Sequence, residues 1–92
     1  MKHLHIRVSG KVQGVYYRAT CKAVADQLGV KGFVMNQPDG SVYIEAEGNN
    51  YTLEAFLEFC KEGPEAAEVV EVHSEEAPLR GYQNFEVLKK KK

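Results

Sequence analysis

The chain of 92 residues has no tryptophan, only two cysteines and no long apolar run. Two cysteines are too few for a disulfide scaffold, and their spacing matches no zinc motif. The apolar stretches are far too short to span a bilayer. Met1 to Gly10 alternates apolar and polar residues, unlike a targeting signal. We therefore expect one cytoplasmic globular domain without a membrane partner.

The two cysteines, Cys21 and Cys60, fall on the expected buried faces of two helices. Buried free thiols behave as small apolar residues and are typical of a reducing compartment. The alternative is a disulfide between the two helices.

Basic residues are also scarce in the chain before its last four residues. Four of the twelve form the run Lys89 to Lys92, so residues 1–88 carry a net charge of −5. Binding of nucleic acid depends on basic patches, so an acidic body argues against a nucleic-acid partner. We expect a domain over residues 1–88, a disordered lysine tail over 89–92, and a monomer.

Apolar spacing predicts strands over 3–8, 30–36, 42–47, 70–72 and, as a short final strand, 85–87. A helix is expected from Tyr17 to Leu28, ended by Gly29. A second helix is expected to begin at Asn50 as its N-cap and to stop at Gly63-Pro64. The order predicts an α+β fold of the ferredoxin-like, split βαβ kind. Its sheet would be antiparallel, with both helices on one face and a short extra C-terminal strand.

A segment with two glycines follows the first expected strand and reads GKVQGVYYR from Gly10 to Arg18. The glycines let the backbone turn sharply, so that several amide N–H groups face inward. The segment leads directly into a helix, whose first amides lack partners and whose dipole is positive there. Arg18 can add a bidentate contact to the same anion. The segment therefore predicts an anion site.

This segment differs from the common nucleotide-binding loops. A Walker A loop ends in Gly-Lys-Ser or Gly-Lys-Thr, and neither Lys-Ser nor Lys-Thr occurs in the chain. The dinucleotide fingerprint needs three glycines at a different spacing. Taken alone, the segment is also compatible with a tight strand-to-helix connection that carries a surface arginine.

Asn36 ends the second expected strand, just before the turn-forming residues Gln37 to Gly40. Its amide can donate and accept, so it can hold a water molecule in one orientation. The alternative is that Asn36 only caps the turn.

Together the two segments closely resemble the two signature motifs of the acylphosphatase family. The first family motif reads Gly-x-Val-Gln-Gly-Val-x-Phe-Arg, and this chain has GKVQGVYYR. The second reads Gly-aromatic-Val-x-Asn, three residues, Gly-x-Val, five residues and Gly. This chain has GFVMN, QPD, GSV, YIEAE and Gly48. The resemblance covers almost the whole chain, including its length and element order.

The resemblance implies hydrolysis of acyl phosphates to a carboxylate and inorganic phosphate, without a metal or cofactor, on a ferredoxin-like fold. Arg18 matches the family's phosphate-binding arginine, and Asn36 matches the asparagine that positions the attacking water. The backbone amides of one stretch match the phosphate cradle: Gln13, Gly14, Val15, Tyr16, Tyr17 and Arg18.

Two positions depart from the family pattern. Tyr17 stands where Phe is usual, and its hydroxyl then needs a partner or water. Cys21 stands where Thr or Ser is common, so the chain lacks a hydroxyl one helical turn after the arginine.

Three histidines lie outside these motifs. His3 and His5 share one strand face with Arg7, and two histidines at that spacing could bind a metal. No third ligand is evident in the sequence, so we expect exposed strand residues and no metal site. His73 is expected to be an ordinary residue of the fourth strand.

A binding module is the alternative to an enzyme, since this sheet fold also serves RNA recognition. Lys31-Gly32-Phe33 resembles the start of an RNP1 motif, but the second aromatic run is missing. A small-molecule regulatory module, or a catalytically silent relative of the family, is the other alternative.

Overall fold

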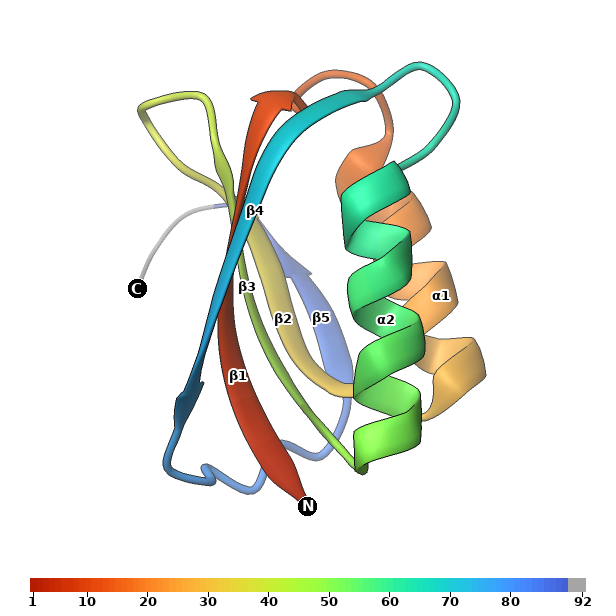
Figure 1. Cartoon of the computed structure of the whole chain (residues 1–92), viewed down its shortest axis with the longest axis vertical. Helices are drawn as coiled ribbons and strands as arrows, with labels where there is room; N and C mark the ends of the chain where they lie inside the picture. Colours follow the sequence, from red (N-terminus) through yellow and green to blue (C-terminus); the bar gives the residue numbers. More distant parts are fainter. Residues whose placement is uncertain (90–92) are drawn as a thin grey trace.

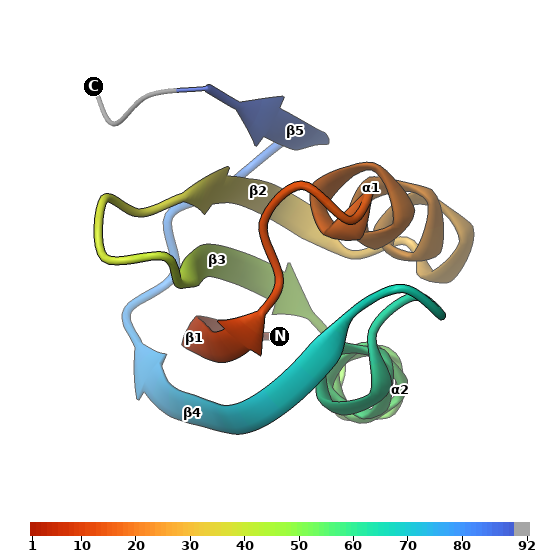
Figure 2. The same cartoon turned by 90° about the horizontal axis from the view of Figure 1, so that it is seen from above.

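A five-stranded sheet carries two helices on one face (Figure 1, Figure 2). The computed structural model describes residues 1–89. The order of elements confirms the predicted α+β, ferredoxin-like fold. The elements are β1 (Lys2–Lys11), α1 (Tyr17–Leu28), β2 (Lys31–Asn36), β3 (Val42–Gly48), α2 (Asn50–Glu62), β4 (Glu68–Ala77) and β5 (Phe85–Leu88).

The strands are arranged in the order β4-β1-β3-β2-β5. The first four pair antiparallel, but β5 pairs parallel to β2, so the expectation of a purely antiparallel sheet is wrong at this edge. The cause is the connection over 78–84, which runs from one edge of the sheet to the other at a single end (Figure 1). The chain therefore enters β5 in the direction of β2.

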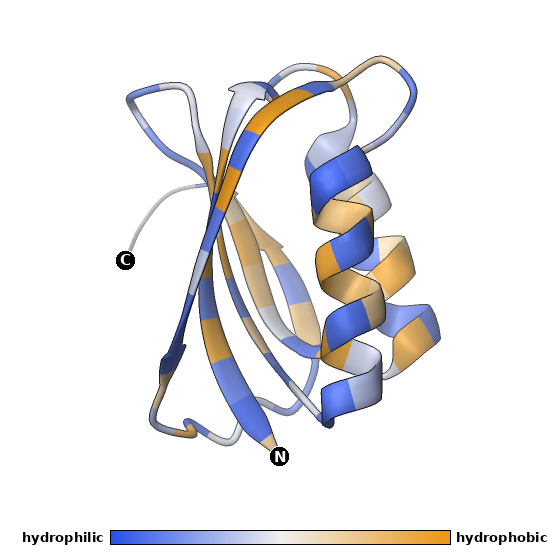
Figure 3. Cartoon of the chain, viewed as in Figure 1, coloured by the Kyte–Doolittle hydropathy of each residue, from blue (hydrophilic) through white to orange (hydrophobic). Residues whose placement is uncertain are grey.

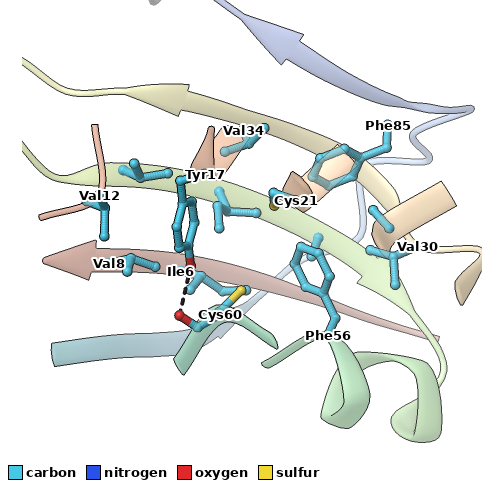
Figure 4. Close-up of a cluster of buried hydrophobic side chains, with 14 of the residues drawn as sticks. Ile6, Val8, Val12, Tyr17, Cys21, Val30, Val34, Phe56, Cys60 and Phe85 are labelled. Carbon is cyan, nitrogen blue, oxygen red and sulfur yellow. Dashed lines mark hydrogen bonds between the residues drawn. The ribbon is translucent and has the colours of Figure 1, made fainter. Parts of the chain in front are cut away.

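The alternation predicted for the first strand sets which face is buried. Ile6 and Val8 are fully buried against the helices, and Leu4 packs beside them. Figure 3 shows apolar and polar residues alternating along β1. The core continues through Phe56 of α2 and Phe85 of β5, whose ring centroids lie 5.8 Å apart (Figure 4).

The helix ends follow from local backbone chemistry. Gly29 ends α1 in the left-handed conformation, as predicted. The N-cap of α2 is Asn49, however, and not Asn50. Asn49 has extended backbone and its Oδ1 accepts a hydrogen bond of 2.9 Å from the N–H of Thr52, whereas Asn50 is already helical.

The sheet face opposite the helices is partly covered. The connection over 78–84 crosses it (Figure 2) and shields His3, Glu45 and Glu47, which are all buried. The expectation that His3 is an exposed strand residue is therefore wrong. His5 is half-buried, and His73 is exposed as expected.

Cys21 and Cys60 are free and buried, as expected. Burial raises the pKa of both thiols, that of Cys60 to about 12. Within residues 1–89, no helix is long and apolar enough to cross a membrane. Lys89 is exposed, and the rest of the expected lysine tail, 90–92, lies outside the described residues.

Candidate active site

The connection between β1 and α1 bends through two left-handed residues. Gly14 has φ +73°, and Tyr16 has φ +64°, a conformation that non-glycine residues rarely adopt. Backbone that alternates in this way turns successive N–H groups toward a common centre. Backbone of this kind can form an anion cradle.

Helix α1 begins without a side chain that caps it. Tyr16 is the N-cap residue, it makes no side-chain capping bond, and the first turn contains no acidic residue. The first N–H groups of a helix have no intrahelical acceptor, and the helix dipole is positive there. These donors point to an anion as their partner.

Arg18 lies in the first turn of α1. Its Nη1 donates a hydrogen bond of 3.1 Å to the carbonyl oxygen of Leu88 in β5. Among residues 1–89, no carboxylate oxygen lies within 4.0 Å of its guanidinium. Its positive charge is thus oriented by a carbonyl but not neutralised by an ion pair.

Asn36 is the last residue of β2, and it lines the same cavity as Arg18. The cavity has a volume of about 390 Å³. The Oδ1 of Asn36 is buried and has no hydrogen-bond partner among the described residues. A buried acceptor without a partner is rare in native proteins and points to a water or ligand donor. The cavity is lined by Val12, Gly14, Tyr16, Tyr17, Arg18, Ala19, Asn36 and Val87.

Two residues of the predicted cradle do not line this cavity. Val15 is buried in the core. The side chain of Gln13 instead reaches the β2–β3 turn, where its Nε2 donates to the carbonyl oxygens of Gln37 (2.8 Å) and Ser41 (2.9 Å). Gln13 therefore fixes the loop against the turn that begins directly after Asn36.

The buried hydroxyl of Tyr17 has a hydrogen-bond partner. It donates a hydrogen bond of 2.8 Å to the carbonyl oxygen of Cys60 in α2 (Figure 4). The ring is buried and lies 5.7 Å from that of Phe59, and burial raises the pKa of the phenol. Tyr17 thus joins the two helices, and it also lines the cavity.

The β2–β3 turn is held by Asp39. Its carboxylate accepts hydrogen bonds from the N–H and Oγ of Ser41 and from Arg7. The bonds from Ser41, with the nearby charge of Arg7, lower the pKa of Asp39. Figure 1 shows this turn and the β1–α1 loop at the same end of the sheet.

Sequence reasoning missed the carbonyl of Leu88 and the side-chain contacts of Gln13. A backbone carbonyl leaves no signal in the sequence, because every residue carries one. The presence of Gln13 in the first motif is the one signal in the sequence that could indicate these contacts.

Comparison with known proteins identifies the family. The Acylphosphatase family model matches residues 4–87. An acylphosphatase of Thermotoga petrophila is 51% identical over 87 residues, covering 95% of this chain and 97% of that protein.

Solved structures agree with the sequence relatives. The crystal structure of acylphosphatase from Bacillus subtilis superposes with a TM-score of 0.93 at 35% identity, covering 96% of this chain and 99% of that one. An acylphosphatase from Coxiella burnetii gives 0.91 at 36% identity, covering 95% and 92%. With this fold and this match over nearly its whole length, the chain belongs to the acylphosphatase family, whose members are hydrolases.

Proposed function

We propose that the chain hydrolyses the carboxyl-phosphate bond of acyl phosphates at the cavity between Arg18 and Asn36. Water attacks phosphorus, and the bond from phosphorus to the acyl oxygen breaks with its electron pair. The products are a carboxylate and inorganic phosphate. The leaving group is a stable carboxylate, so the reaction depends mainly on positioning and on stabilising charge.

Arg18 and the backbone N–H groups of the loop bind the phosphoryl oxygens in this proposal. The uncapped start of α1 and the absence of an ion pair at Arg18 within residues 1–89 support it. Donors that are already oriented before the reaction stabilise charge at little reorganisation cost. The hydrogen bond to Leu88 supplies such orientation for the guanidinium.

Asn36 holds the attacking water. The observation that carries this role is its buried Oδ1, which has no partner within residues 1–89 and lies on the cavity shared with Arg18. An acceptor there can take one O–H of a water molecule and so direct the oxygen lone pair toward phosphorus. The water proton passes to an oxygen of the substrate's own phosphate, so no separate base is needed.

The test is hydrolysis of benzoyl phosphate in EDTA by the parent chain and by Asn36→Ala. We expect turnover by the parent to be unaffected by EDTA. In Asn36→Ala, kcat should fall about 100-fold, while the inhibition constant for inorganic phosphate changes less than about threefold. Asn84→Ala, which removes an exposed asparagine in the connection before β5, is the matched control and should keep full activity.

Two results would count against the proposal. Equal kcat in the parent and in Asn36→Ala would show that Asn36 does not position the attacking water. Binding of phosphate without any turnover of benzoyl phosphate by the parent would favour a silent binding module.

A further inference from the structure

His3, His5 and Glu45 come together on the sheet face opposite the helices, away from the phosphate cavity. We propose that these three side chains form a binding site for a divalent transition-metal ion, with Zn²⁺ as the best match. Each offers one ligand atom, and the three atoms lie within 4.8 Å of one another. Two imidazoles and one carboxylate are a known ligand set for Zn²⁺.

The two distances from Glu45 to the histidines are close to those around a shared ion. Glu45 Oε1 lies 2.9 Å from His3 Nε2 and 3.6 Å from His5 Nε2. Bonds of about 2.0 to 2.2 Å in a tetrahedral site place ligand atoms about 3.3 to 3.6 Å apart. The distance from Glu45 to His5 is therefore already close to this range. The distance from Glu45 to His3 would have to lengthen by a few tenths of an ångström.

His5 supplies the observation that calls for a partner. Its Nε2 is buried and has no hydrogen-bond partner among the described residues. The nearest carboxylate oxygen, on Glu45, is too far for a hydrogen bond. A metal ion between them would give the His5 nitrogen the partner that it lacks.

Hydrogen bonds on the side away from the proposed ion already orient the ligand side chains. His3 Nδ1 lies 2.7 Å from Glu47 Oε2, the arrangement in which a carboxylate orients a metal-binding histidine. Glu47 is in turn fixed by the backbone N–H groups of Arg80, Gly81 and Tyr82. With His3, these backbone donors give the buried carboxylate of Glu47 its hydrogen-bond partners.

Glu45 is oriented in a similar way. The hydroxyls of Tyr43 and Tyr82 each donate a hydrogen bond of 2.8 Å to its carboxylate. Binding of the ion at His3 Nε2 replaces any proton on that nitrogen, which leaves to solvent, while Nδ1 keeps its proton for Glu47.

The proposed site borders a hollow in the surface. A hollow of about 760 Å³ on this face is lined in part by His5, Glu45, Tyr43 and Tyr82. Water from this hollow can fill a fourth coordination position. Mg²⁺ and Ca²⁺ should not bind, because both prefer oxygen ligands.

The test measures metal uptake by the full chain, stripped with a chelator and free of any affinity tag. Isothermal titration with Zn²⁺ should show one equivalent bound, and titration with Co²⁺ should produce the strong visible absorption of a tetrahedral site. In His5→Gln, whose side chain is partly exposed, affinity for Zn²⁺ should fall at least about tenfold. His73→Gln, an exposed histidine on β4, should bind like the parent.

Circular dichroism verifies that both variants fold. Zn²⁺ should also raise the melting temperature of the parent and of His73→Gln, and raise that of His5→Gln by less at the same concentration. No uptake of Zn²⁺ by the parent at micromolar concentrations would overturn the proposal, as would equal affinity in the parent and His5→Gln. Neither result bears on hydrolysis of benzoyl phosphate, which is measured in EDTA.

Discussion

The guanidinium of Arg18 and the carbonyl of Leu88 are joined by a hydrogen bond of 3.1 Å, across 70 positions of sequence. The bond ties the first turn of α1 to the last strand of the sheet. It limits the rotamers of a long side chain that would otherwise be free, so the charge is already placed when a ligand arrives.

Removing Leu88 should therefore weaken catalysis. A chain that ends at Val87 loses the acceptor, and kcat/KM for benzoyl phosphate should fall about tenfold, as expected for about 1.4 kcal/mol of lost orientation. A chain that ends at Lys89 keeps the acceptor and serves as the control. Equal kcat/KM in the two truncated chains would show that the bond to Leu88 does not matter.

Gln13 should affect both stability and activity. Gln13→Ala removes two hydrogen bonds to the β2–β3 turn, although each carbonyl keeps one backbone partner. We expect the free energy of unfolding in urea to fall by about 1 kcal/mol, and kcat/KM to fall because the loop is no longer fixed against Asn36. Gln83→Ala, at an exposed position, should change neither. An unaltered kcat/KM in Gln13→Ala would contradict this role.

The hydroxyl of Tyr17 should contribute to stability and not to chemistry. Tyr17→Phe keeps the ring but leaves the buried carbonyl of Cys60 without this donor, so the free energy of unfolding should fall by about 1 kcal/mol. The kcat for benzoyl phosphate should stay within about twofold of the parent. Tyr51→Phe, an exposed tyrosine on α2, is the control. A large loss of kcat in Tyr17→Phe would place the hydroxyl in the reaction.

Asp39 should make the β2–β3 turn sensitive to acid. Its pKa is lowered in the folded chain, so its stabilising effect is complete above the unfolded pKa of about 3.9 and is lost as the pH falls through the folded value. The difference in urea midpoint between the parent and Asp39→Asn should be present at neutral pH and shrink as the pH falls below about 3.9. A difference that is constant with pH would show that the charge of Asp39 is not responsible.

Much of the fold was predictable because it depends on local signals. Alternation assigned the buried face of β1, and Gly29 and Gly63 marked the ends of both helices. The N-cap of α2 was misplaced by one residue because Asn49 and Asn50 have the same capping chemistry. Only the backbone conformation separates them.

The errors on the other sheet face have a non-local cause. Glu45 and Glu47 alternate with apolar residues, as in a strand with one solvated side, yet both are buried. The connection over 78–84 covers them, and no local pattern predicts where a loop some thirty residues away will cross. For the same reason Glu45 could not be recognised from the sequence as a third ligand beside His3 and His5.

In the proposed mechanism, Arg18 and the loop amides bind the phosphoryl group during hydrolysis. The most direct measurement is kcat/KM for benzoyl phosphate in Arg18→Ala, with Arg80→Ala as a matched loss of charge outside the cavity. We predict a loss of about a thousandfold or more in Arg18→Ala and none in Arg80→Ala. Full activity in Arg18→Ala would contradict the account.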